Sequence, residues 1–169
     1  MKRALLVAAL AIFPVVPVAN AQEANAPVTI AQPTISLAGA RQMAAAVTAM
    51  AAERGDHVAL AIVDAGGNLV YFERMDGAVL AATDIALAKA DTAIGLTAPT
   101  QVFADLARAN TGAVLGLLSA DYSLMGGGRP VAIDGHVVGA IAVSGAANGG
   151  DDSYALAALA AIGADAGPN

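Results

Sequence analysis

The stretch from residue 127 to residue 162 constrains the fold more than any other part of the chain. The pair Asp134-Gly135 stands between two apolar runs. Because a two-residue primed turn needs positive φ at its centre, this pair predicts a β-hairpin. The second strand is expected to end at Ser144, and a helix is expected to begin at the Asp151-Asp152 pair after a glycine-rich loop.

The preceding residues repeat this alternation of hairpin and helix. In chain order the sequence predicts a helix between a capping Ser36 and a terminating Gly55, strands at 57–63 and 69–72, helices at 78–96 and 100–109, and a segment at 114–118 that fits either a helix or a strand. Two hairpins separated by helices favour an α+β domain, in which helices cover an antiparallel sheet.

The first 21 residues have the three parts of a secretory signal peptide. Lys2 and Arg3 form a positive start, an apolar run follows, and small residues end it at Ala21. We therefore expect a signal peptide at 1–21, a flexible leader at 22–34 and a single domain at 35–165. The expected location is periplasmic or secreted.

The apolar run of the signal peptide is broken by Pro14 and Pro17 and is too short to span a bilayer comfortably. No membrane association is therefore expected once this segment is removed. The mature chain would have about 148 of the 169 residues, which is the size of one ordinary domain.

Charge and cysteine content exclude several partners and chemistries. The formal charge of −6 becomes −8 when Lys2 and Arg3 are removed, and the remaining basic residues are dispersed. Nucleic acids bind through clustered cations, so nucleic acid binding is not expected. The chain contains no cysteine, which excludes a thiolate nucleophile and a thiolate metal site.

Four segments together resemble the GlcG/HbpS-like family over about residues 35 to 162. The similarity is carried by Ser36-Leu37 with Gly55-Asp56-His57, by residues 61–69, by residues 88–93 with 98–100, and by residues 127–130 with 139–145. The resemblance implies a profilin-like fold and a homo-oligomer, either a tetramer or an octamer. It also implies haem as a cofactor, since some members bind haem, as does a similar domain that ends the PduO-type corrinoid adenosyltransferases.

Histidine is the first candidate for the axial ligand of a haem iron, and the chain has only His57 and His136. His57 falls at the expected helix-to-strand turn, where haem-binding relatives also tend to carry a histidine, so it is the candidate metal ligand. The alternative is a solvated histidine near a helix C-terminus, where positive charge is favoured. His136 is expected at the tip of the second hairpin.

Other candidate ligand-binding residues are cations and hydroxyls. Lys89, Arg74 and Arg129 could each meet a haem propionate or another small acidic ligand, although Lys89 could instead pair with Asp84 or Asp91 on its own helix. The resemblance implies that a threonine hydroxyl serves as an axial contact in some relatives, and the local matches here are Thr92 and Thr100. Thioether and phenol alternatives are Met43, Met50, Met75, Met125, Tyr71, Tyr122 and Tyr154.

Familiar catalytic motifs do not fit this chain. The loop at 145–150 links a strand to a helix like a phosphate loop, but it lacks the Gly-Lys-Ser/Thr sequence. Asp151 and Asp152 at the start of the helix would repel a phosphate and are expected to cap the helix instead. Ser144 does not stand in a G-x-S-x-G sequence. The sequence therefore favours an exported, oligomeric haem- or small-ligand-binding protein for sequestration, delivery or sensing. The alternatives are an enzyme or enzyme accessory acting on a small organic acid, and a structural oligomer.

Overall fold

The structure is a computed structural model that describes residues 27–109 and 111–165. The expected signal peptide at 1–21 and the first part of the expected leader lie outside the described residues. The chain from Gln32 onward forms one compact unit, which holds the sheet, the helices and the candidate site. Among the described residues, no helix is both long enough and apolar enough to cross a membrane.

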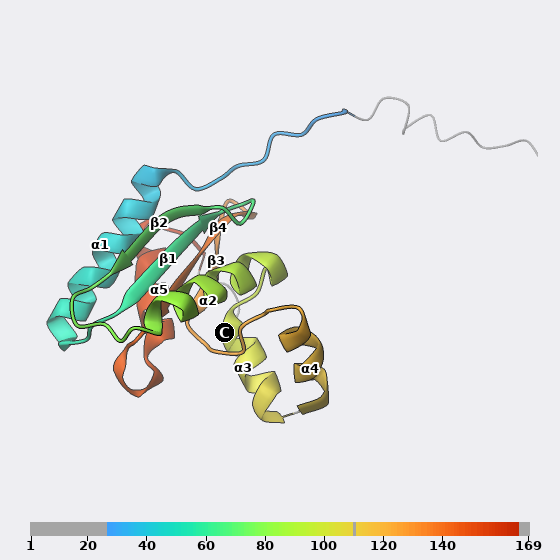
Figure 1. Cartoon of the computed structure of the whole chain (residues 1–169). Helices are drawn as coiled ribbons and strands as arrows, with labels where there is room; N and C mark the ends of the chain where they lie inside the picture. The colour runs from blue at the N-terminus through green and yellow to red at the C-terminus, as the bar shows by residue number, and fades with distance from the viewer. Residues whose placement is uncertain (1–26, 110, 166–169) are drawn as a thin grey trace, which may run out of the picture. The chain divides into compact units, whose positions relative to one another are not determined.

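The compact unit is an α+β domain built on a four-stranded antiparallel sheet, as the sequence predicts (Figure 1). The strands lie in the order β2-β1-β4-β3, so the two hairpins meet through their β1 and β4 strands. In chain order the elements are α1 (Leu37–Arg54), β1 (Ala59–Asp64), β2 (Leu69–Arg74), α2 (Ala82–Leu96), α3 (Thr100–Ala109), α4 (Thr111–Ser119), β3 (Gly128–Ile133), β4 (His136–Ser144), the short 3₁₀ helix η2 (Ala147–Gly149) and α5 (Asp151–Ala161).

Helices cover both faces of the sheet, with α1 and α5 on one face and α2 on the other (Figure 1). Side chains of a strand alternate between the two faces, so Leu60 and Ile62 of β1 join the α1–α5 core, whereas Ala59 and Ala61 join the α2 core. The central strand is therefore buried on both sides. This explains its continuous apolar sequence.

The α2 face of the sheet is built from small residues. Four alanines of α2 lie against alanines of β1 and β4, and all of them are fully buried: Ala82, Ala86, Ala90, Ala93, Ala59, Ala61, Ala140 and Ala142. Small side chains allow the helix backbone to approach the sheet closely. The alanine-rich face of α2 therefore packs against the chain's own sheet.

Most predicted element boundaries agree with the structure because local signals set them. The Ser36 hydroxyl accepts a hydrogen bond from the Gly39 amide at 3.1 Å, and Gly55 ends α1 with a φ of 70°. Asp134 and Gly135 have φ values of 50° and 77°, as the predicted primed turn requires.

Some predicted boundaries differ from the structure, and one open assignment is settled by it. The helix expected from residue 78 begins only at Ala82, because the chain turns at Gly77 with a φ of 82° and Ala81 has no side chain that can cap the helix. The first strand begins at Ala59, two residues later than predicted. The ambiguous segment at 114–118 is helical and belongs to α4, which packs beside α3 (Figure 1).

The β1–β2 turn gives a testable pH dependence. The Asp64 carboxylate accepts hydrogen bonds from the Asn68 amide at 2.8 Å, from the Asn68 side chain and from the Gly66 amide, and these bonds hold its pKa below the ordinary value of 3.8. A lowered pKa adds stability above the unfolded-state pKa, and this stability is lost as the pH falls through the folded-state pKa. We expect Asp64→Ala to flatten the acid limb of the stability profile between about pH 5 and 2, measured by urea unfolding at each pH.

Candidate functional site

Lys89 lies in the middle of α2 and is fully buried. Its ammonium donates to the Asp151 carboxylate at 2.7 Å and to the Val143 carbonyl at 3.1 Å. The sequence suggested Asp84 or Asp91 as its acid because these residues lie on the same helix. The structure shows an acid 62 positions away. Lys89 faces the end of strand β4, and α5, which carries Asp151, follows that strand after a short loop.

Arg129 on β3 forms a second ion pair at the start of α5. Its Nε donates to one Asp152 oxygen at 2.7 Å and a terminal nitrogen donates to the other oxygen at 2.8 Å. This two-pronged geometry is the strongest arrangement of an arginine with a carboxylate. The arginine is 3% exposed, so both acids expected to cap α5 neutralise buried cations instead.

The two predicted threonines are both fully buried. The Thr100 hydroxyl accepts from the Gly128 amide at 2.9 Å, so it ties α3 to β3 in addition to standing at the start of its own helix. The Thr92 hydroxyl donates to the Ala88 carbonyl at 2.7 Å and accepts from the Ser123 amide at 2.8 Å. The hydrogen-bonding groups of both hydroxyls therefore have structural partners.

We call Lys89, Thr100, Arg129, Asp151 and Asp152 the α5 polar cluster. Two cavities border it. One, of about 240 Å³, is lined by Lys89, Asp151 and Gln101, and the other, of about 350 Å³, is lined by Arg129, Asp152 and Gln101. The cluster thus combines cations with access for a small polar ligand. However, each cation already has a carboxylate partner within the chain.

Among the predicted site residues, His57, Arg74 and Thr92 lie outside the α5 polar cluster, and Thr92 bonds to Ala88 and Ser123. His57 is exposed in the connection between α1 and β1, and Arg74 is exposed at the end of β2. The His57 imidazole packs against Gly77, where an added Cβ would lie 3.2 Å from its Cγ and Nδ1. Val79 and Leu80 follow in the same loop and are 63% and 82% exposed.

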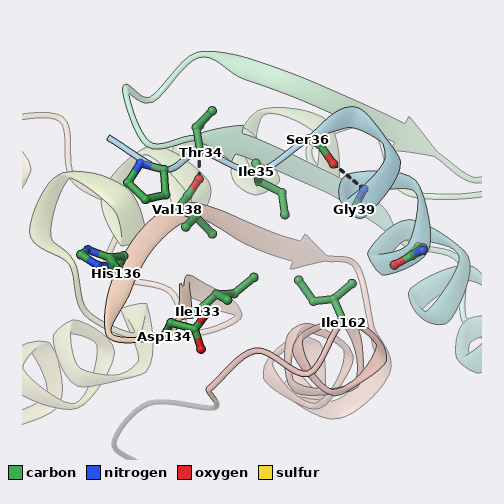
Figure 2. Close-up of a pocket in the computed structure, with 11 residues that line it drawn as sticks. Thr34, Ile35, Ser36, Gly39, Ile133, Asp134, His136, Val138 and Ile162 are labelled. Carbon is green, nitrogen blue, oxygen red and sulfur yellow. Dashed lines mark hydrogen bonds between the residues drawn. The ribbon is translucent and has the colours of Figure 1, made fainter. Parts of the chain in front are cut away.

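A third cavity, of about 330 Å³, is bordered by His136 and was not predicted from the sequence. Figure 2 shows the apolar side chains of Ile35, Ile133, Val138 and Ile162 around its interior and His136 and Asp134 to one side. The apolar lining comes from the segment before α1, from the β3–β4 hairpin and from the end of α5: Ile35, Ile133, Val138 and Ile162. Only the folded chain brings these four residues together, so no local pattern indicates this cavity.

The thioether and phenol alternatives have mostly structural surroundings. Met43 is fully buried in the α1–α5 core, and Met50 and Met75 pack against it. Burial and then the hydrogen bond to Asp56 raise the pKa of Tyr154, and the hydrogen bond to Glu73 and burial raise that of Tyr71. Both phenols therefore stay protonated at neutral pH. Within the described part of the chain, no three His, Asp or Glu side chains gather as a metal site.

Comparison with known proteins identifies the family. Residues 35–160 match the sequence profile of the family described as haem degrading protein HbpS-like. The chain belongs to this family, which confirms the resemblance seen in the sequence.

Individual relatives agree with this assignment. A 15.0 kDa protein encoded in the dhaT-dhaS intergenic region of Citrobacter freundii is 40% identical over 66% of this chain and 80% of its own length. Protein GlcG of Escherichia coli K12 is 32% identical over 62% of this chain and 79% of its own length.

Solved structures have the same fold. Klebsiella pneumoniae protein ORFY superposes with a TM-score of 0.75 at 34% identity, covering 82% of this chain and 97% of that one. The PduOC:heme complex superposes with a TM-score of 0.72 at 29% identity, covering 79% of this chain and 98% of that one.

Proposed function

We propose that this chain is an exported, homo-oligomeric haem-binding protein that serves in sequestration, delivery or sensing, with His57 as the axial ligand of the iron. The observation that carries the proposal is the exposed His57 imidazole, which packs against the loop that holds the exposed Val79 and Leu80. The chain belongs to a family described by haem degradation, and one solved relative is a complex with haem. Export is supported by the signal-peptide pattern of residues 1–21.

The residues around His57 fit a haem. An accessible imidazole nitrogen can ligate iron, and the exposed Val79 and Leu80 side chains offer apolar surface for the flat face of the macrocycle. Arg74 ends the neighbouring strand β2, and its guanidinium is suited to a propionate. Bound haem would supply an iron centre. The chain itself would supply the imidazole, the apolar contact and the cation.

Lys89 and Arg129 are less suited to holding a free acid, because a ligand carboxylate would have to replace Asp151 or Asp152 as their partner. The thermodynamic cost of separating a buried ion pair is high. The small-acid alternative remains a prediction with its own readout: a short-chain carboxylate should raise the melting temperature and haem should not.

Exposed apolar side chains on α3 and α4 support the homo-oligomer. Leu115 and Leu118 of α4 are 70% and 51% exposed, and Val102 and Leu106 of α3 are also exposed. Apolar surface gathered on two neighbouring helices is typical of an interface. We expect Leu115→Lys with Leu118→Lys to reduce the assembly to a smaller species, measured by light scattering after size exclusion. Val28→Lys, a change of an exposed apolar residue before the domain, is the control. An unchanged mass in the double variant would exclude this surface as the interface.

The proposal is tested by titrating haemin into the chain from Gln22 onward and following absorbance. Saturable binding near one haem per chain, with a shifted Soret band, supports it. An unrelated acidic protein of similar size is the control for nonspecific adsorption. Binding no tighter than that of the control would contradict the haem proposal and would make a stability screen with carboxylates the next experiment.

A further inference from the structure

The α1–β1 connection that carries His57 is exposed. The side chains of Arg54 and Asp56, which flank Gly55, nevertheless form hydrogen bonds to η2 and to the start of α5. The Asp56 carboxylate accepts from the Tyr154 hydroxyl at 2.5 Å and from the Ala147 amide at 3.3 Å. These hydrogen bonds restrict the conformation of the turn more than its exposure alone would indicate.

A second set of contacts involves Arg54, the last residue of α1. Its guanidinium donates to the Ser153 hydroxyl at 2.9 Å and lies 5.1 Å from the centre of the Tyr154 ring. The ring itself is fully buried in the α1–α5 core. Tyr154 therefore contacts both residues that flank Gly55, one through its ring and the other through its hydroxyl.

The backbone and ring of His57 are also closely packed. An added Cβ at Gly145 would lie 2.9 Å from the His57 carbonyl oxygen, and one at Gly77 would lie 3.2 Å from the imidazole. Both glycines have positive φ, 106° at Gly145 and 82° at Gly77. The chain thus approaches His57 closely from two loops, while the side chain remains accessible to a ligand.

We propose that Tyr154 is a positioning residue for His57: through Asp56 and Arg54 it fixes the α1–β1 connection to α5 and holds the imidazole ready to bind. This inference rests on the proposed haem function and adds a residue to it. Tyr154 does not touch the ligand. Holding the α1–β1 connection in one conformation raises the affinity for haem, because less conformational freedom is lost when haem binds.

Tyr154→Phe removes the hydroxyl and keeps the buried ring. Tyr71→Phe is a matched control, because the Tyr71 hydroxyl donates to the Glu73 carboxylate at 2.7 Å on a different part of the sheet. If only about a tenth of Tyr154→Phe molecules hold the binding geometry, the apparent Kd for haem rises about tenfold. The Soret band should also broaden as the imidazole samples several positions. In Tyr71→Phe, both quantities should match the unsubstituted protein.

Amide hydrogen exchange at Asp56 and Ala147, whose amides donate to the Ala51 carbonyl and to the Asp56 carboxylate, is measured by NMR without haem and separates this inference from the haem proposal. We expect exchange at both amides to accelerate about tenfold in Tyr154→Phe and to stay unchanged in Tyr71→Phe. If the unsubstituted protein binds no haem, the proposed function fails and the positioning role is judged by exchange alone. Equal haem affinity in the two variants, or unchanged exchange in Tyr154→Phe, would overturn the positioning role.

Discussion

Lys89→Met is expected to lower the free energy of unfolding by about 3–5 kcal/mol, because it leaves a largely buried carboxylate without its cation. The Asp151 side chain is 13% exposed and Lys89 is fully buried, so water cannot replace the lost partner well. For a domain of this size the melting temperature should fall by about 10 °C. Urea unfolding monitored by circular dichroism measures the change.

Two further variants make this prediction specific. Adding Asp151→Asn to Lys89→Met removes the orphaned charge while keeping an oxygen for the Ala146 amide, so part of the stability should return. Arg108→Met breaks the exposed ion pair with Asp105, and exposed pairs contribute at most about 1 kcal/mol. A loss in Lys89→Met no larger than that in Arg108→Met would contradict the buried-pair account.

Gly139→Ala is expected to be the most disruptive single-methyl change in the sheet. Gly139 lies on β4 opposite Asp64 of β1, and an added Cβ would lie 2.3 Å from the Val63 carbonyl oxygen and 3.0 Å from an Ile35 methyl. Because one neighbour is backbone of the central strand, the clash cannot be relieved by turning a side chain. We expect a loss of about 3 kcal/mol or more.

The matched control is Gly116→Ala on α4, where an added Cβ would meet no atom within 4 Å. Replacing a helical glycine with alanine stabilises a helix by about 0.5–1 kcal/mol. The two variants should therefore shift the unfolding midpoint in opposite directions. A Gly139→Ala protein as stable as the unsubstituted one would show that β1 and β4 are not paired in the register described here.

The fold was predictable from sequence where a local signal determines the backbone. Ser36, Gly55 and the Asp134-Gly135 pair each specify their conformation through a cap or a positive φ. The start of α2 was predicted four residues too early, because residues 78–81 have the composition of a helix and only the turn at Gly77 prevents it. The pairings of β1 with β2 and of β3 with β4 followed from the two predicted hairpins, whereas the pairing of β1 with β4 depends on contacts distant in sequence.

The candidate site was less accessible to sequence reasoning because its partners are far apart in the chain. Lys89 and Arg129 were predicted as cations that could meet an acidic ligand, but their carboxylates within the chain lie 62 and 23 positions away. The Asp151-Asp152 pair was interpreted as a helix cap, which is the common use of acids at that position. Lys89 and Arg129 each stand in an apolar segment, and Asp151 and Asp152 are adjacent acids. This combination is the sequence signal that would have indicated the two ion pairs.

The measurement that tests the central claim most directly is a haemin titration of His57→Ala beside His136→Ala. The chain has only these two histidines, and both are exposed, so each variant is the other's control for a general loss of imidazole. The account predicts that His57→Ala loses the shifted Soret band and that His136→Ala keeps it with unchanged affinity. Retained binding in His57→Ala, together with loss in His136→Ala, would contradict it and would place the haem at the cavity beside the β3–β4 hairpin.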